Sequence, residues 1–367
     1  MNQLDSRPKL QPGTLLRDTY TIDSFLGRGA FADTYLVRHR YMGMQALKLL
    51  ISPGDDESLQ VGLAEAFLLS RITHNGIVRV FDANEVLLDG KRYPYLTMEY
   101  VPDGTLAEML EACDDGLQLS IALDVASQIT AALGHAHSQD PPIIHRDIKP
   151  ANVLLEIGQD ERVRVQVADF GLACRVNRLT EVAEATGTVM YMSPESMRGY
   201  EVAASDVFSA GLVFYQLLTG TLPYPASNLR DAGSVHGLQS AVLEAQKQPM
   251  KPPSYFDRKI PPGVDAVALR ALEPDERKRY ATGDAFAEAI HACQVATGMP
   301  HAAAGDLQAA TAKSAVHAAM ALAGSSETLG QAVVKLTAAI ERWPHLEQYY
   351  GQHLESLLSQ QKRLQCS

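Results

Sequence analysis

Cysteine is scarce and scattered in this chain of 367 residues. The four cysteines, Cys113, Cys174, Cys293 and Cys366, lie far apart and form no CxxC pair. Structural zinc sites and disulfide frameworks both need cysteines at close or regular spacing. The pattern therefore indicates neither, and it is typical of a protein from a reducing compartment.

Long hydrophobic runs are also absent. No segment approaches the roughly 18 apolar residues of a membrane span, and the N-terminal MNQLDSRPKLQPG lacks the apolar core of a signal peptide. The formal net charge of −11 argues against nucleic-acid binding. We therefore expect a cytoplasmic protein with no membrane span and no nucleic-acid partner.

The hydrophobic periodicity changes once along the chain. Residues 20–101 alternate short apolar runs with turns, as in YTIDSFLG and YPYLTMEYV, which predicts an antiparallel sheet. Within this part, residues 58–72 carry apolar side chains at helical spacing, which predicts one helix. Residues 102–295 are mainly helical in pattern. A small β-rich part thus precedes a larger α-rich part, and the fold class is α+β.

Both ends of the chain are expected to lie outside this domain. Residues 1–19 are interpreted as an N-terminal extension, and residues 296–305, with Gly, Pro and Ala but little apolar periodicity, as a linker. Residues 306–367 are predicted to form an α-helical C-terminal extension.

One apolar seam runs through this extension at alternating spacings of four and three. It consists of Leu329, Val333, Leu336, Ile340 and Trp343. The favoured interpretation is a helical hairpin packed on the main domain. A tetratricopeptide-like repeat, suggested by Ala332, Ala339 and Pro344, is the alternative, although no second copy is evident.

Three motifs point to the chemistry. IIHRDIKPANVLL covers residues 143–155, VADFGLA covers 167–173 and YMSPE covers 191–195. In order and spacing they resemble the signature of the eukaryotic-like serine/threonine protein kinases, in the compact form of the bacterial branch. GRGAFA near the N-terminus is weak evidence alone but fits the same pattern. The resemblance covers about residues 20–293 and implies a bilobal fold, with the β-rich part as N-lobe and the α-rich part as C-lobe.

The resemblance implies transfer of the γ-phosphate of ATP to a protein hydroxyl with Mg²⁺, or with Mn²⁺ in its place. Asp147 would accept or orient the proton of the substrate hydroxyl, and Lys149 would steady the γ-phosphate. Asn152 and Asp169 would hold the metal, a hard cation that prefers oxygen ligands. The sequence HRDIKPAN is similar to the serine/threonine form of the motif, and Thr188 supports the same choice.

Lys48, in QALK, would contact the α- and β-phosphates. Such a lysine needs an anion to hold it in place. Glu65, in the helix predicted over residues 58–72, is the favoured partner, and Glu57, in the acidic turn before it, is the alternative.

The stretch LGRGAFADTY, residues 26–35, would form a strand–turn–strand whose glycines let backbone amides approach phosphate. It departs from the family pattern at Ala32, where a third glycine is usual, and at Thr34, where Val is usual, so we expect altered nucleotide affinity rather than loss of activity. Met98 would be the gatekeeper, and residues 99–101 would form the hinge that pairs the adenine edge. The implied nucleotide-binding set is Leu26, Gly27, Gly29, Thr34, Ala46, Lys48, Glu65, Met98, Glu99, Val101 and Leu154.

Arg146 precedes the expected catalytic Asp, an arrangement common in kinases that are switched by phosphorylation of the segment after DFG. Thr180 and Thr186 are the candidate phosphorylation sites in that activation segment. Thr188 is instead expected to contact Asp147 and Lys149.

Five further residues are expected to be structural. Glu195 is predicted to pair with Arg279, and Asp206 is predicted to hold the catalytic loop through backbone amides. His145 and Phe170 are expected to pack rather than to take part in the chemistry.

The implied partner is a protein substrate with a Ser or Thr acceptor. Thr105, Ala151 and Gln216 stand at three positions where basophilic relatives usually carry acids, which predicts no strong demand for Arg upstream of the target. The C-terminal helices leave open either a homodimer or the docking of a partner protein.

Two other functions have to be weighed. A pseudokinase or scaffold that binds partners through its C-terminal helices is suggested by the altered glycine loop, but it would not need the complete set of Lys48, Glu65, Asp147, Asn152 and Asp169. A small-molecule kinase would share Asp147 and Asn152, but such enzymes usually lack the Lys after HRD and the GT…SPE segment that contacts a peptide.

Overall fold

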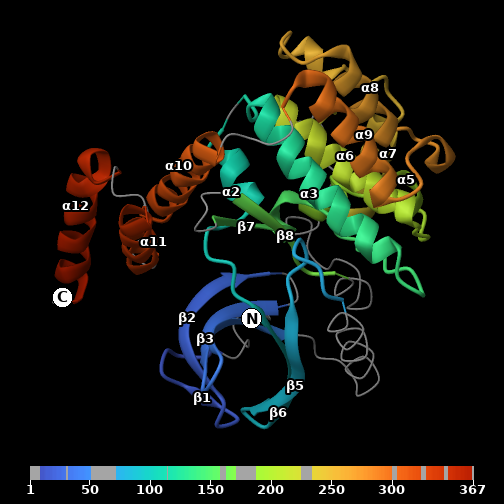
Figure 1. Cartoon of the computed structure of the whole chain (residues 1–367). Coiled ribbons are helices and arrows are strands. Elements are labelled where there is room, and N and C mark those ends of the chain that lie inside the picture. Colours follow the sequence, from blue (N-terminus) through green and yellow to red (C-terminus); the bar gives the residue numbers. More distant parts are fainter. Residues whose placement is uncertain are drawn as a thin grey trace.

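The computed structural model describes residues 9–29, 32–50, 72–113, 115–157, 163–170, 187–224, 234–299, 304–323, 328–342 and 346–365. Within these residues the chain forms a β-rich N-lobe and a helical C-lobe, which lie at the bottom and top of Figure 1. The predicted α+β bilobal fold is confirmed. The helix predicted over residues 58–72 lies outside the described residues except for Ile72.

The N-lobe is an antiparallel sheet with the strand order β1-β2-β3-β4-β6-β5. Its strands are β1 (Leu15–Leu16), β2 (Tyr20–Arg28), β3 (Ala32–His39), β4 (Gly43–Leu50), β5 (Val80–Leu88) and β6 (Lys91–Glu99). Because side chains alternate between the two faces of a strand, the apolar positions gather on one side. There they form a core around Tyr35, Leu47 and Tyr95.

The sheet begins before residue 20, in the segment interpreted from the sequence as an extension. β1 pairs with β2, with Leu16 opposite Tyr20, and both Leu10 and Leu16 are buried in the N-lobe core. Residues 9–19 are therefore part of the N-lobe. A strand of two residues is too short to show the alternation that identifies a strand in a sequence.

The C-lobe is built mainly of helices, with a short antiparallel ribbon facing the N-lobe. Its elements are α2 (Leu106–Glu111), α3 (Leu119–His137), η2 (Pro150–Asn152), β7 (Val153–Ile157), β8 (Val163–Val167), α5 (Pro194–Met197), α6 (Ala203–Thr219), α7 (Val235–Gln246), η4 (Pro253–Tyr255), α8 (Pro262–Ala271), η5 (Glu276–Lys278) and α9 (Gly283–Thr297). Helix α6 is buried along nearly its whole length, because almost all of its residues are apolar or small. It ends at Gly220, whose φ of 72° is the left-handed conformation that glycine adopts without strain.

Two glycines bring α3 and α9 into backbone contact. Gly134 of α3 faces Gly283 at the start of α9, and a Cβ added to either residue would collide with backbone atoms of the other helix. The amide of Gly283 also donates a hydrogen bond of 3.1 Å to His137 Nδ1. The position of α9 on α3 is thus fixed by backbone as well as by side chains.

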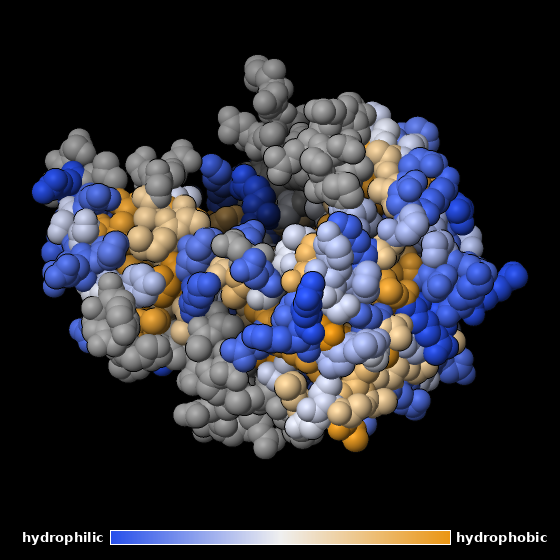
Figure 2. Space-filling model, turned by 90° about the horizontal axis from the view of Figure 1, so that it is seen from above, coloured by the Kyte–Doolittle hydropathy of each residue, from blue (hydrophilic) through white to orange (hydrophobic). Residues whose placement is uncertain are grey.

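The described part of the C-terminal extension contains three helices, one more than the favoured hairpin. They are α10 (Ala304–Leu322), α11 (Leu329–Arg342) and α12 (Glu347–Gln365). Helix α10 packs against α2, and α11 contacts both α10 and α12. They lie on the left of the C-lobe in Figure 1, and the view from above in Figure 2 shows them as a lobe beside it, with polar and apolar residues mixed on the surface.

The apolar seam predicted for the extension joins the core of the C-lobe. Leu329, Val333 and Leu336 are buried in the same cluster as C-lobe residues, and Ile340 packs against it. Trp343 lies outside the described residues. Across the described ranges, no helix combines the length and hydrophobicity that a bilayer crossing requires.

An ion pair is buried between α5 and the segment before α9. The guanidinium of Arg279 donates to both carboxylate oxygens of Glu195, at 2.7 and 3.0 Å, and both side chains are almost fully buried. The remaining guanidinium N–H groups donate to the backbone carbonyls of Glu273, Ala204 and Pro274. Burial raises the pKa of Glu195, but Arg279 outweighs this effect and holds the pKa below its usual value.

Replacing Arg279 by Leu should lower the free energy of unfolding by about 3–5 kcal/mol, because the Glu195 carboxylate would stay buried without its cation. Urea unfolding at pH 7, followed by circular dichroism, measures the change. Lys247→Ala is the matched control, since it removes an exposed ion pair with Glu244 and should cost less than about 1 kcal/mol. Equal losses in the two variants would contradict the prediction.

Candidate active site

The HRD loop, residues 145–152, is held by one carboxylate from α6. Asp206 accepts hydrogen bonds from the backbone N–H of His145 at 2.7 Å and of Arg146 at 2.9 Å. His137 Nε2 lies 2.9 Å from the same carboxylate. Arg146 has a φ of 73°, which is unusual for a residue other than glycine. The paired amides hold the loop in this otherwise unfavourable conformation.

Asp147 lies at the centre of a hydrogen-bonded cluster. Its Oδ2 accepts from Lys149 Nζ at 2.8 Å and from Asn152 Nδ2 at 2.9 Å. Lys149 Nζ also donates to Thr188 Oγ1 at 2.8 Å. Pro150 starts a single 3₁₀ turn that carries Asn152 back toward Asp147. The structure thus brings an acid, a cation, an amide and a hydroxyl together from one short loop and the segment before α5.

The hydrogen bonds of His145 identify a neutral imidazole. Its Nδ1 accepts from the backbone N–H of Asp147 at 3.2 Å, and its Nε2 lies 2.8 Å from the carbonyl oxygen of Ala168. The proton must therefore be on Nε2. Burial lowers the pKa of His145, which agrees with this assignment. Its ring also packs on Phe170, with 4.4 Å between ring centroids. Both residues are placed as parts of the core.

Lys48 and Asp169 form an ion pair between the two lobes. Lys48 Nζ on β4 lies 2.7 Å from Asp169 Oδ2, just after β8. Burial raises the pKa of Asp169, but the adjacent Lys48 more than reverses this and brings the pKa below its usual value. The carboxyl group of Asp169 is therefore ionised at neutral pH.

The glycine-containing turn between β2 and β3 is described up to Gly29 and again from Ala32. A Cβ added to Gly27 would meet no atom of the described residues within 4 Å, so packing among these residues does not require glycine there. Gly29 N–H donates to Ala32 O at 2.8 Å and closes the turn. Thr34 lies opposite Gly27 on β3. The space beside Gly27 fits the close approach of a ligand to the backbone.

Apolar residues expected at the adenine site form one cluster beside the turn between the lobes. Ala46 on β4 pairs with Met98 on β6, and both are buried together with Val101. Leu154 of β7 packs against this cluster from the C-lobe. Leu26, on β2, is exposed. Both the backbone and the side chain of Glu99 form hydrogen bonds. Its N–H donates to Arg79 O at 2.9 Å, and its carboxylate accepts from Gln166 Nε2 at 3.3 Å.

Several predicted residues cannot be placed. Glu65 and its alternative Glu57 lie outside the described residues, as do Thr180 and Thr186. Thr188 is described, and it accepts a hydrogen bond from Lys149, which also donates to Asp147.

Two ion pairs near the site were not predicted. Arg28 and Asp33 pair across the glycine turn through two hydrogen bonds of 3.0 Å. Arg146 Nε lies 2.8 Å from Glu201 Oε2, in the loop before α6. The first pair could have been found from its position at the facing ends of two predicted strands, whereas no sequence signal links residues 146 and 201.

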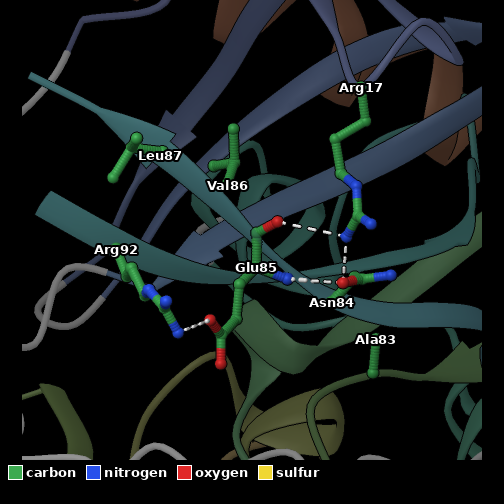
Figure 3. A pocket seen from close by; sticks show the side chains of 7 residues that line it. All are labelled: Arg17, Ala83, Asn84, Glu85, Val86, Leu87 and Arg92. Carbon is green, nitrogen blue, oxygen red and sulfur yellow. Dashed lines mark hydrogen bonds and ion pairs between the residues drawn. The ribbon is translucent and has the colours of Figure 1, made fainter. Parts of the chain in front are cut away.

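A separate hollow of about 420 Å³ lies on the N-lobe. The residues that line it, drawn in Figure 3, are Arg17, Ala83, Asn84, Glu85, Val86, Leu87 and Arg92. Arg17 hydrogen-bonds to the side chain of Asn84 and to the carbonyl oxygen of Glu85, and Arg92 pairs with the Glu85 carboxylate at 3.6 Å. No residue predicted from the sequence to be functional lines this hollow. It is therefore distinct from the candidate active site.

Comparison with known proteins agrees with this geometry. A family model described as the protein kinase domain matches residues 20–291. The probable serine/threonine-protein kinase SCO3848 of Streptomyces coelicolor is 34% identical over 284 residues, which are 75% of this chain and 40% of that protein. The serine/threonine-protein kinase PknB of Mycolicibacterium smegmatis is 32% identical over 276 residues, covering 73% of this chain and 41% of that protein.

Solved structures show the same likeness. The crystal structure of the Mycobacterium tuberculosis PknI kinase domain superposes with a TM-score of 0.57 at 28% sequence identity, covering 77% of this chain and 99% of that chain. The chain spans less than half the length of the curated relatives named above.

Replacing Lys48 by Met should raise the pKa of Asp169, because the carboxyl group stays partly buried while the nearest cation that offsets burial is lost. In the wild type, the low folded-state pKa means that ionised Asp169 stabilises the fold above its unfolded-state pKa, and this contribution is lost as the pH falls. In the variant the folded-state pKa lies closer to the unfolded one, so ionised Asp169 contributes less stability at neutral pH and stability depends less on the ionisation of this group.

A ¹³C NMR titration of the aspartate carboxyl groups measures this pKa directly. Lys48→Arg, which keeps the positive charge, is the control and should leave the pKa low. An unchanged pKa in Lys48→Met would contradict the assignment.

Proposed function

Because the chain belongs to the protein kinase family, we propose that it is a serine/threonine protein kinase that transfers the γ-phosphate of ATP to a protein hydroxyl. The observation that carries the proposal is the bridge made by Lys149, which donates to both Asp147 and Thr188. It links the carboxylate expected to receive the substrate proton with the segment expected to receive the substrate.

In this proposal each polar group has one task. Asp147 orients the attacking hydroxyl and accepts its proton, since its Oδ2 is positioned by two N–H donors. Lys149 offsets negative charge that builds up on the transferred phosphoryl group. Lys48 binds the α- and β-phosphates from the N-lobe, and the amides around Gly27 bind phosphate from above.

The protein kinase family uses ATP with a divalent metal, and the side chains here suit Mg²⁺. Asn152 Nδ2 donates to both the backbone oxygen and the carboxylate of Asp147. Because both partners are acceptors, the amide nitrogen must face Asp147, which directs Oδ1 of Asn152 the other way. That oxygen and the ionised carboxylate of Asp169 are ligands that a hard cation prefers. The bound metal would neutralise charge on the phosphate oxygens.

The adenine ring would lie among the cluster of Ala46, Met98, Val101 and Leu154, with its edge on the backbone of residues 99–101. The substrate is a protein serine or threonine without a strong requirement for upstream Arg. Gln216, at one of the three positions considered for this preference, accepts a hydrogen bond of 2.6 Å from Tyr191 and offers no carboxylate. We place the enzyme in the cytoplasm, which the scattered cysteines favour.

Neither of the other functions gains support. A pseudokinase would have no need of the Lys48–Asp169 pair or of the cluster around Asp147. Any contact of the extension with a second copy of the chain or with a partner would have to use the outer surfaces of α10, α11 and α12, because their inner surfaces pack in the C-lobe core.

Asp147→Asn and Lys48→Met should each abolish transfer of labelled phosphate from Mg²⁺-ATP to protein, because the first removes the proton acceptor and the second the phosphate-binding cation. The measurement is incorporation of ³²P into a generic protein substrate, followed by phosphoamino-acid analysis, which should show phosphoserine or phosphothreonine. Lys247→Ala, an exposed surface change, should retain full activity. Undiminished transfer in Asp147→Asn would contradict the proposal.

The enzyme should phosphorylate its own activation segment at Thr180 or Thr186. A phosphate there, with a charge of about −1.5 to −2, would compete with Glu201 for Arg146 and order the segment. Mass-spectrometric mapping should find the phosphate in the wild-type protein and not in Asp147→Asn prepared in the same way. A wild-type protein without phosphate at either threonine, after incubation with Mg²⁺-ATP, would rule this out.

A further inference from the structure

The helix α11 of the C-terminal extension contacts the chain segment that follows the hinge. Lys335 Nζ lies 2.7 Å from Glu108 Oε1, and Arg342 donates to Asp103 Oδ2 at 3.0 Å. Lys335 and Arg342 are seven residues apart, so they project from the same face of α11, about two turns from each other. Helix α11 therefore forms ion pairs with the first and the last residue of the segment 103–108.

The same segment also borders the proposed adenine site. Asp103 follows Val101 by two residues, and its N–H donates to Leu155 O at 3.2 Å. Leu155 N–H donates to Gly104 O at 3.0 Å, and Thr105 forms a bridge with Leu154. The segment thus forms backbone bonds to the strand that supplies Leu154 to the site. Its path is fixed by Gly104, whose φ of 89° is strained for any other residue.

Glu108 takes part both in the capping box of α2 and in the ion pair with α11. Its Oε2 accepts from the backbone N–H of Thr105 at 2.8 Å and completes the capping box at the start of α2. Its Oε1 accepts from Lys335. Burial raises the pKa of Glu108, but Lys335 reverses the shift and the net pKa is lowered, so the pair is charged at neutral pH. One carboxylate therefore joins the end of the hinge segment to the extension.

The apolar packing of the extension on the C-lobe does not by itself connect the extension to the hinge. Buried α10 residues such as Ala312 and Val316 share a core cluster with Leu106 and Met109 of α2, which attaches the extension to the C-lobe. The two ion pairs lie at the edge of that contact and reach the segment that leads back to the hinge. Asp103 is especially constrained, since its side chain is 6% exposed. Removing the cations would leave the apolar attachment in place.

We propose that Lys335 and Arg342 of the C-terminal extension are positioning residues for nucleotide binding, because they hold residues 103–108 and thereby set the geometry of the hinge. The proposal rests on the proposed kinase function. It makes docking of α11 and binding of ATP reciprocally linked: the factor by which docked α11 strengthens ATP binding equals the factor by which bound ATP strengthens the docking of α11. The extension is then part of the nucleotide site without touching the nucleotide.

The test compares the full-length chain with the double variant Lys335→Ala/Arg342→Ala. The dissociation constant of a fluorescent ATP analogue with Mg²⁺ is measured by titration, and KM for ATP, KM for the protein substrate and kcat are measured separately. Both cations are partly exposed, and ion pairs with exposed partners are individually weak, so we expect about a three- to tenfold rise in the nucleotide dissociation constant and in KM for ATP. The KM for the protein substrate should not change.

The matched control is Lys362→Ala/Arg363→Ala on α12, which removes two exposed cations from the same extension and changes the net charge equally. It should leave nucleotide binding unchanged. Lys335→Arg should bind as the wild type does, because the cation is kept. These two variants separate the contact from the general effect of charge.

Glu108→Gln supplies an independent check. Glutamine can still accept from Thr105 and keep the capping box, but it loses the charge that pairs with Lys335. If the Lys335–Glu108 pair transmits the effect, the variants Glu108→Gln and Lys335→Ala weaken nucleotide binding and their combination is no worse than either alone. Additive effects would overturn the role given to this pair.

An unchanged nucleotide dissociation constant in Lys335→Ala/Arg342→Ala, or an equal change in the α12 control, would overturn the inference while leaving the kinase function intact. If the wild-type chain bound no ATP analogue at all, both proposals would fail together. Equal thermal unfolding midpoints of the double variant and the wild type would show that a weaker affinity does not arise from unfolding. A weaker affinity accompanied by a matching loss of stability would count against the inference.

Discussion

The carboxylate of Asp206 is the contact on which the candidate site depends most directly. It stands in the first turn of a buried helix and accepts from two consecutive backbone amides of the HRD loop, while His137 binds it from α3. The neighbouring Ser205 donates to Glu195 at 2.7 Å, within the buried ion pair with Arg279. Two adjacent residues of α6 thus join the loop that bears Asp147 to the buried network of Glu195 and Arg279. Buried contacts of the C-lobe therefore hold the loop that carries Asp147 in place.

The two lobes are also connected by charge. Lys48 belongs to the N-lobe sheet and Asp169 follows the C-lobe ribbon, so their ion pair spans the space between the lobes. Backbone bonds add to this, because Val78 N–H donates to Val167 O at 3.0 Å and Val167 N–H donates to Gly76 O at 2.8 Å. A nucleotide bound there would meet positive charge from Lys48 and Lys149 and negative charge from Asp147 and Asp169. The site is therefore arranged for polyphosphate together with a cation rather than for an anion alone.

Much of the fold and of the site could be predicted from the sequence, because the residues involved are near each other in the chain or belong to a recognisable motif. Asp147, Lys149 and Asn152 fall within six positions, and the two-part periodicity gave the lobes. β1 was missed because two residues show no period. The contact between Lys335 and Glu108 joins residues 227 positions apart, and no motif links the two residues. Such a contact depends on the packing of whole helices, which periodicity does not reveal.

The backbone contact between Gly134 and Gly283 has a consequence for the C-terminal end of the molecule. Helix α9 ends at Thr297, only a few residues before α10 begins. Neither glycine can be replaced without forcing α3 and α9 apart. Helix α9 therefore has one position on the C-lobe, and the chain leaves the end of this helix at a fixed point. The positions that α10, α11 and α12 can take depend on where α9 ends. A methyl group added at residue 134 or 283 would therefore push α9 away from α3, while α10 and α11 keep their own contacts with α2 and with residues 103–108.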